Sequence, residues 1–410
     1  MKLTVASVLS LVGAAAAATD GPFSIGAAAS GFEIGVLNTT ILCNVTSTGL
    51  NLKNQVIGFG IAASLPNLVK ANQPFYVQAA TRLIVPASIN NLAYGFGART
   101  YAGNATQVIV NALGSTPSTL DAASTPLPIP SAPVVSGGVS ILNVPAVGAS
   151  LKVGPFMGAT ANSKVVFSIG SIAALVRTYD ASGKATFLVA NISCPAQSRP
   201  ASLAYVAVGA AVANSTAVMP PAVASIPTIP MNSTAGVTGY SYTCTFTNVG
   251  KATVRVSLGA VKASNAAVAS GSSISITSGQ GNIFASAALV KLIKSKYANA
   301  NSFSLTVANL AFNAVNASPA SINGIPSGGL TSSVLPASAD TVITVPKDAP
   351  ATTLAPISFT AGASGSTALI SLGAASGTLA VYQDANLLAN VAFSCPALAP
   401  QVPIFPWDIL

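Results

Sequence analysis

The chain has 410 residues, 51% of them hydrophobic and only 6% charged, which excludes a chain that is disordered throughout. Its 17 basic and 8 acidic residues give a net charge of +9 through a scarcity of acids, because the basic residues cluster only at Lys291, Lys294 and Lys296. Nucleic-acid binding, which needs more cations on one face, is therefore not expected. Weak attraction to an anionic wall polymer or membrane surface stays open.

Residues 1–18 resemble a secretory signal peptide. Lys2 precedes an apolar stretch from Leu3 to Val12, and the small residues Ala16–Ala18 suit a cleavage site. The alternative interpretation is a buried N-terminal strand. No later stretch has the roughly 18 apolar residues of a membrane helix, so we expect no transmembrane segment. The predicted localisation is extracellular, either free or associated with a cell wall.

Short alternating segments predict strands in the first part of the chain. Residues 164–169, 173–179 and 186–193 read as strands, the last two joined in a hairpin by the turn Asp180–Gly183. Residues 86–96 predict a short helix that is weakened by Gly95. The Gly-Phe-Gly runs at 57–60 and 94–97 lack a phosphate-binding context, so we interpret them as strand bends or turns.

The second part of the chain repeats this plan. Helix periodicity is predicted over 284–297, with a Leu/Ile face packed on a sheet and the lysines in solvent. Strands are predicted around it and toward the C-terminus, over residues 240–246, 253–258, 368–372, 378–382 and 387–394.

The four cysteines have a regular spacing. Cys43 and Cys194 are 151 residues apart, and so are Cys244 and Cys395. Val144-Pro145 and Ser193–Ala196 recur 201 residues later as Val345-Pro346 and Ser394–Ala397. The sequence therefore predicts a tandem duplication.

Duplication favours one disulfide within each copy, Cys43–Cys194 and Cys244–Cys395, and both should be oxidised in an exported protein. Four free or metal-binding thiols are the alternative, but the chain has no His to complete a zinc site, and no metal is expected.

These observations predict a mainly β chain of two tandem β-sandwich-like units, each with a short helix and one disulfide. The predicted boundaries are 1–18 for the signal peptide, 19–199 for the first unit, 200–239 for a Pro-rich linker, 240–399 for the second unit and 400–410 for the tail. The apolar stretch Leu203–Val212 within the linker could add a strand or dock on a unit. Pro-rich stretches inside each unit leave open whether a unit is one sandwich or two subdomains.

Candidate sites are few. N-glycosylation sequons are the most frequent, at Asn38, Asn44, Asn104, Asn191, Asn214, Asn232 and Asn316. Near the C-terminus, Phe405 and Trp407 are candidates for ligand contact, unless the tail folds back and buries them.

The sequence contains few residues in arrangements suited to catalysis. The absence of His excludes Ser-His-Asp and Cys-His arrangements, and Asp180 and Asp384 fall in hairpin turns where Asp favours turn geometry. No cofactor motif is present.

The segments Tyr242–Phe246, Val345-Pro346, Phe359–Gly362 and Phe393–Pro396 resemble a Cys-bounded domain of unknown function found in secreted actinobacterial and some fungal proteins. The first unit departs from that pattern at Leu42-Cys43-Asn44. The resemblance implies a secreted β-rich domain and no activity.

The leading hypothesis is a non-enzymatic extracellular or cell-wall-associated structural or adhesive protein, with a cell-wall polymer or extracellular glycan as partner. The alternative is a secreted carbohydrate- or ligand-binding module, such as an effector. A hydrolase with an unrecognised acid pair is the third hypothesis.

Overall fold

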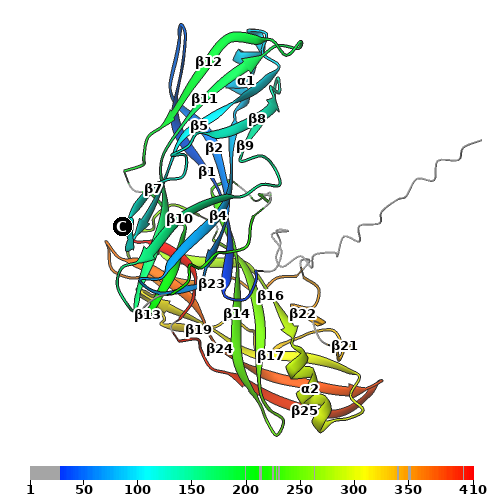
Figure 1. The fold of residues 1–410 in the computed structure, drawn as a ribbon. Helices are drawn as coiled ribbons and strands as arrows, with labels where there is room; N and C mark the ends of the chain where they lie inside the picture. The colour runs from blue at the N-terminus through cyan, green and yellow to red at the C-terminus, as the bar shows by residue number, and fades with distance from the viewer. Residues whose placement is uncertain are drawn as a thin grey trace, which may run out of the picture.

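The computed structural model describes residues 28–198, 200–211, 215–223, 226–227, 229, 231–262, 264–338, 341–349, 352–399 and 401–410. Strands predominate, and the two helices are short. The molecule is elongated, with the first half of the chain at one end and the second half at the other (Figure 1). The predicted signal peptide lies outside the described residues.

The first half contains α1 and thirteen strands. In chain order they are β1 (Phe32–Ser47), β2 (Leu50–Pro66), β3 (Leu68–Ala71), β4 (Pro74–Val85), α1 (Ala87–Gly95), β5 (Thr100–Leu113), β6 (Ser115–Thr116), β7 (Thr119–Asp121), β8 (Leu127–Pro133), β9 (Ser140–Val144), β10 (Leu151–Gly158), β11 (Ser163–Tyr179), β12 (Ala185–Cys194) and β13 (Ala204–Ala211).

The second half contains α2 and the remaining strands. In chain order they are β14 (Ser233–Phe246), β15 (Gly250–Lys262), β16 (Ser273–Ala285), α2 (Ala287–Lys296), β17 (Ser302–Val315), β18 (Ala317–Ser318), β19 (Ser321–Asn323), β20 (Leu330–Thr331), β21 (Leu335–Pro336), β22 (Thr341–Val345), β23 (Ile357–Ala361), β24 (Thr367–Gln383), β25 (Asn386–Cys395) and β26 (Pro403–Asp408).

Alternating side chains explain why the predicted strands form. In β14, Tyr240, Tyr242, Cys244 and Phe246 are buried while the Ser and Thr residues between them are exposed. Both predicted helices are present, each shorter by a residue or more at its ends than the sequence pattern suggested. Ser286 caps α2 by accepting a hydrogen bond from the Leu289 N–H (3.2 Å).

The two halves use corresponding strand pairings. β1 pairs with β12 and β14 pairs with β25, in registers that place Asn44 opposite Ser193 and Thr245 opposite Ser394. Likewise β4 pairs with β9 and β10, and β16 pairs with β22 and β23. Nearly all these ladders are antiparallel, whereas β13 and β3 are parallel.

Two disulfides join the first and last cysteine-bearing strands of each half. Cys43 bonds Cys194 with an S–S distance of 2.09 Å, and Cys244 bonds Cys395 with 2.00 Å. The predicted pairing is confirmed. Each bridge closes a loop of 151 residues, and a loop of this length restricts the unfolded chain strongly.

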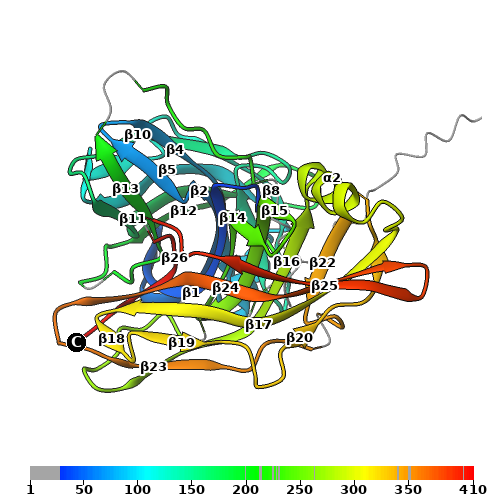
Figure 2. The same cartoon turned by 90° about the horizontal axis from the view of Figure 1, so that it is seen from below.

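The halves are not separate sandwiches, because the described strands form one large mixed sheet. The seam between the halves is the ladder of β1 and β14, from Glu33 opposite Thr238 to Asn38 opposite Ser233. Figure 2 shows the second half from below, with β26 running along β24 on the side that faces the first half. The mainly β class with one disulfide in each half is confirmed, whereas the structure shows one large mixed sheet and does not show the predicted tandem sandwich units.

Much of the interval predicted as a linker, 200–239, is structured. β13 pairs with β11 and β3, and the first residues of β14 form the seam. The physical reason is the apolar composition of this stretch, since Val206 and Val208 are buried in the core of the first half.

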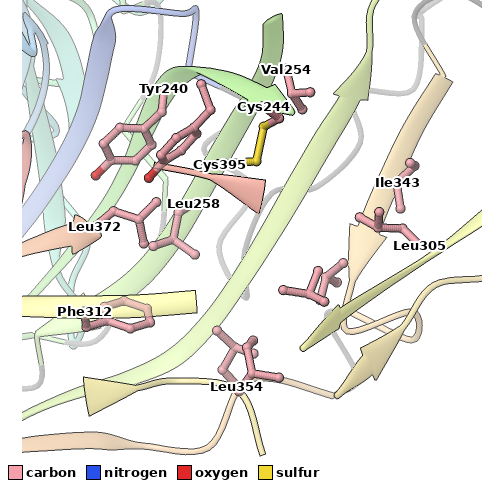
Figure 3. Packing of buried hydrophobic residues seen from close by; sticks show 14 of the residues in the cluster. Tyr240, Cys244, Val254, Leu258, Leu305, Phe312, Ile343, Leu354, Leu372 and Cys395 are labelled. Carbon is pink, nitrogen blue, oxygen red and sulfur yellow. A yellow bond between two sulfur atoms is a disulfide. The ribbon is translucent and has the colours of Figure 1, made fainter. Parts of the chain in front are cut away.

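The cores differ between the halves. In the first half, one cluster of buried residues surrounds the Cys43–Cys194 disulfide and another surrounds Phe75, Phe156 and Phe167 near the seam. The second half has one cluster, which extends past the Cys244–Cys395 disulfide (Figure 3). No helix among the described residues is long and apolar enough to cross a membrane.

Candidate ligand-binding surface

The predicted ligand contacts Phe405 and Trp407 are buried, with exposed fractions of 1% and 3%. The tail folds back as β26 and pairs with β24, placing Trp407 opposite Ala368. Buried Lys262 holds it by donating a hydrogen bond from Nζ to the Pro406 carbonyl (2.7 Å). Of the two alternatives that the sequence leaves open, the structure shows the one in which the tail folds back and buries these rings, which removes a large apolar area from water. Phe405 and Trp407 are therefore not exposed for ligand contact.

The exposed aromatic side chains of the described residues lie elsewhere, and all three are at the far end of the first half. Tyr94 is 38% exposed, Phe96 47% and Phe187 63%. We call these three residues, together with Arg99, the aromatic tip. Exposed apolar groups that gather in one place mark interaction sites more often than scattered ones do.

Phe96 and Phe187 form the centre of the aromatic tip. Their ring centroids are 5.6 Å apart and the rings are nearly perpendicular, at 78°. Phe96 follows the last turn of α1, whereas Phe187 lies at the start of β12. Residues distant in the sequence thus meet through the fold, and an edge-to-face pair of this kind is itself favourable.

Arg99 fixes the position of Tyr94, the third ring of the aromatic tip. Its guanidinium lies over the Tyr94 ring, 3.7 Å from the centroid, and it donates hydrogen bonds to the carbonyls of Tyr94 (3.1 Å) and Ala98 (2.8 Å). The cation therefore fixes the Tyr94 ring while adding donors at the edge of an apolar platform.

A buried amide anchors the helix that carries this surface. Asn90 donates from Nδ2 to the Gly138 carbonyl (2.8 Å) and accepts at Oδ1 from the Tyr101 hydroxyl (3.0 Å). Burial raises the pKa of Tyr101 to about 12, so the hydroxyl stays protonated and able to donate. These bonds fix α1 against the sheet and thereby position Tyr94 and Phe96.

The hairpin that carries Phe187 is closed by Asp180. Its carboxylate accepts hydrogen bonds from the Ser182 hydroxyl (2.6 Å) and from the N–H groups of Ser182 (2.8 Å) and Lys184 (3.0 Å). The Ser182 hydroxyl and these backbone groups hold the pKa of Asp180 below its usual range. The residue serves turn geometry, as the sequence predicted.

The carboxylates do not form a catalytic pair within the described part of the chain. Asp180 and Asp384 occupy equivalent turns at opposite ends of the molecule (Figure 1). Asp121 accepts bonds from backbone N–H groups, Asp408 accepts two from Ser202, and Glu33 is buried in the seam. The described residues contain no cluster of three potential metal ligands.

Two cavities in the described part of the chain are alternative candidates for a site. One, of about 80 Å³, lies inside the apolar core of the second half. The other, of about 500 Å³, lies between the two halves, lined by Gln197, Pro200 and Ala201 of the first and by Thr367 and Asp408 of the second. Both oxygens of the Asp408 carboxylate accept hydrogen bonds from Ser202, so this carboxylate has little capacity left to bind a ligand in the cavity.

The predicted glycosylation sites differ in their environment. Asn38 is buried, with its Nδ2 donating to the Ile229 carbonyl (2.7 Å), so it has no room for a glycan. Asn214 lies outside the described residues. The remaining sequons are exposed or half-buried, at Asn44, Asn104, Asn191, Asn232 and Asn316.

The aromatic tip is not predicted from the sequence. The run Tyr94–Gly97 is predicted as a strand bend or turn; in the structure Tyr94 and Gly95 end α1, and Gly97, with a φ of 87°, forms the turn that follows the helix. The one available signal was the placement of two large rings among glycines, where a core position is improbable. Phe187 gave no signal, because its contact with Phe96 depends on the fold.

Comparison of the chain with models of protein families, and with curated proteins, finds no match.

Proposed function

We propose that this chain is a non-catalytic extracellular adhesive protein that attaches to a carbohydrate polymer through the aromatic tip. The observation that carries the proposal is the exposed, edge-to-face pair of Phe96 and Phe187. A flat ring exposes an apolar face that packs on the C–H face of a pyranose, while Arg99 supplies donors for sugar hydroxyls.

The elements that position the aromatic tip support the proposal that it binds carbohydrate. Phe96 directly follows a helix anchored by Asn90, and Phe187 lies on β12, which is paired with β11, so binding orders few side chains. The low fraction of charged residues and the two disulfides suit an extracellular setting. The corresponding pairings of the two halves support a duplicated ancestral unit, later fused by the β1–β14 seam.

The proposal is tested by sedimentation with insoluble polysaccharides such as chitin, cellulose and β-1,3-glucan. Wild-type protein should co-sediment with at least one of them, and the double variant Phe96→Ala/Phe187→Ala should lose roughly tenfold in affinity. Leu387→Ala/Leu388→Ala removes exposed apolar side chains at the opposite end and should bind as wild type does. Equal binding by both double variants, or no binding by wild type, would contradict the proposal.

Association with the cell wall is a separate part of the proposal. Fractionation of a tagged protein should place it in the wall fraction and release it with soluble competing polysaccharide. Recovery of the protein only from the medium would favour the alternative of a diffusible binding module or effector.

A further inference from the structure

The far end of the second half has a chemistry different from that of the aromatic tip. Strand β15 exposes Lys251, Thr253 and Arg255 in alternation with buried Ala252 and Val254. The neighbouring strand β14 places Thr245 opposite Lys251 and Ser241 opposite Arg255. This sheet surface is therefore polar and cationic.

Helix α2 adds three more cations beside that strand. Lys291, Lys294 and Lys296 are exposed, while Leu289, Val290 and Ile293 are buried. The helix is attached to β15, because the Ser286 hydroxyl donates to the Thr253 carbonyl (3.1 Å) and Leu292 lies against Gly250. We call Lys251, Arg255, Lys291, Lys294 and Lys296 the basic face.

The equivalent surface of the first half carries fewer cations, with Lys53 as the exposed one on β2 near these positions. Leu50 and Asn54 stand 201 residues before Lys251 and Arg255, and α1 contains no charged residue. The two halves thus have a corresponding strand and helix at this place, but the helix is cationic only in the second half. At the basic face, Arg255 is also ordered, since its guanidinium lies 3.9 Å from the centroid of the Phe284 ring.

We infer that the basic face binds an acidic polysaccharide, a chain that bears carboxylate or sulfate groups. The cations spread along a strand and a helix instead of surrounding a cavity, which suits an extended polymer better than a small anion. The Ser and Thr hydroxyls of β14 lie beside the cations of β15 and can bond sugar hydroxyls. This site is distinct from the aromatic tip and does not depend on the proposed function.

Two other anionic partners fit the face less well. The apolar face of α2 is packed in the core, so the helix cannot insert it into a bilayer. Two aromatic rings lie beside these cations, and both are half-buried: Phe284 beneath Arg255, and Tyr297 at the end of α2 against the core. The face therefore offers no fully exposed ring for stacking on nucleobases.

The inference is tested with the full chain on a resin that carries polygalacturonate, eluted by a salt gradient. Lys291→Gln/Lys294→Gln/Lys296→Gln should elute at clearly lower salt, with about tenfold weaker binding. The control Lys53→Gln/Lys70→Gln/Lys184→Gln makes the same change in net charge at exposed positions of the first half and should elute near wild type. Circular dichroism checks that both variants fold.

Equal losses in the two lysine variants would overturn the inference, because net charge alone would then explain binding. Tighter binding to duplex DNA, or to vesicles that contain phosphatidylserine, would overturn the choice of polysaccharide. The Phe96→Ala/Phe187→Ala variant should bind polygalacturonate as wild type does, so failure of the proposed function and failure of this inference are distinguishable.

Discussion

Glu33 is an acidic side chain enclosed in the seam between the halves. It is 6% exposed, and burial raises the pKa of its carboxyl to about 8. Burial also raises the pKa of Tyr205 and Tyr240, and the charge of Glu33 contributes to both increases. At neutral pH the native protein therefore keeps Glu33 protonated.

This arrangement predicts that stability falls as pH rises. An unfolded Glu loses its proton near pH ~4.3 whereas the folded one keeps it to about 8, so the folded state loses relative stability across that interval. Glu33→Gln should add up to about 3 kcal/mol to the free energy of unfolding at pH 7, and almost nothing at pH 4. Urea unfolding at both pH values measures this, and an equal gain at both would contradict it.

The seven sequons give a second prediction at the scale of single residues. Expression in a glycosylating host should modify exposed Asn104 and Asn191 and leave Asn38 unmodified, because the Asn38 amide is bonded to the Ile229 carbonyl inside the protein. Peptide mass spectrometry after enzymatic deglycosylation in ¹⁸O-labelled water reports each site. A glycan on Asn38 in folded protein would show that this part of the seam opens.

At the scale of elements, α1 depends on the buried amide of Asn90. Asn90→Ala should lower the free energy of unfolding by about 2 kcal/mol, because it leaves the Gly138 carbonyl and the Tyr101 hydroxyl without their partner. It should also weaken polysaccharide binding, since Tyr94 and Phe96 lose their support. Tyr101→Phe, which removes one bond, is the milder control, and chemical denaturation with co-sedimentation measures both effects.

Some of these elements could be predicted from local sequence patterns, and others could not. Alternation in Tyr240–Phe246 and helix periodicity in 284–297 are local, so both elements were predicted, as was the disulfide pairing from the equal spacings. The β1–β14 seam was not, because pairing between strands about 200 residues apart leaves no local pattern. The aromatic tip was not predicted for the same reason, since Phe187 reaches Phe96 only through the fold. The lysines of α2 are visible as a cluster in the sequence, but their neighbours on β15, such as Lys251, are brought to them only by the fold.

At the scale of the whole molecule, a shared sheet predicts that the halves unfold together. Calorimetry should show one transition. Gly239→Val should destabilise the seam, because a side chain there would meet the Ala29 carbonyl, 2.3 Å from the Cβ position. We expect this variant to unfold at lower temperature and in two steps, whereas Gly95→Ala, at an open position of helix α1, should still unfold in one step. Two transitions in wild type would contradict the coupling.

The geometry of the seam has a mechanical consequence. β1 runs from the seam toward the end that carries the aromatic tip, and β14 runs from the seam toward the end that carries α2 (Figure 1). If the two ends were held by different polymers and drawn apart, β1 and β14 would slide lengthwise against each other. Their hydrogen bonds would then resist in shear, all at once instead of one after another, and beyond the seam each disulfide would keep the first and last cysteine-bearing strands of its half from separating.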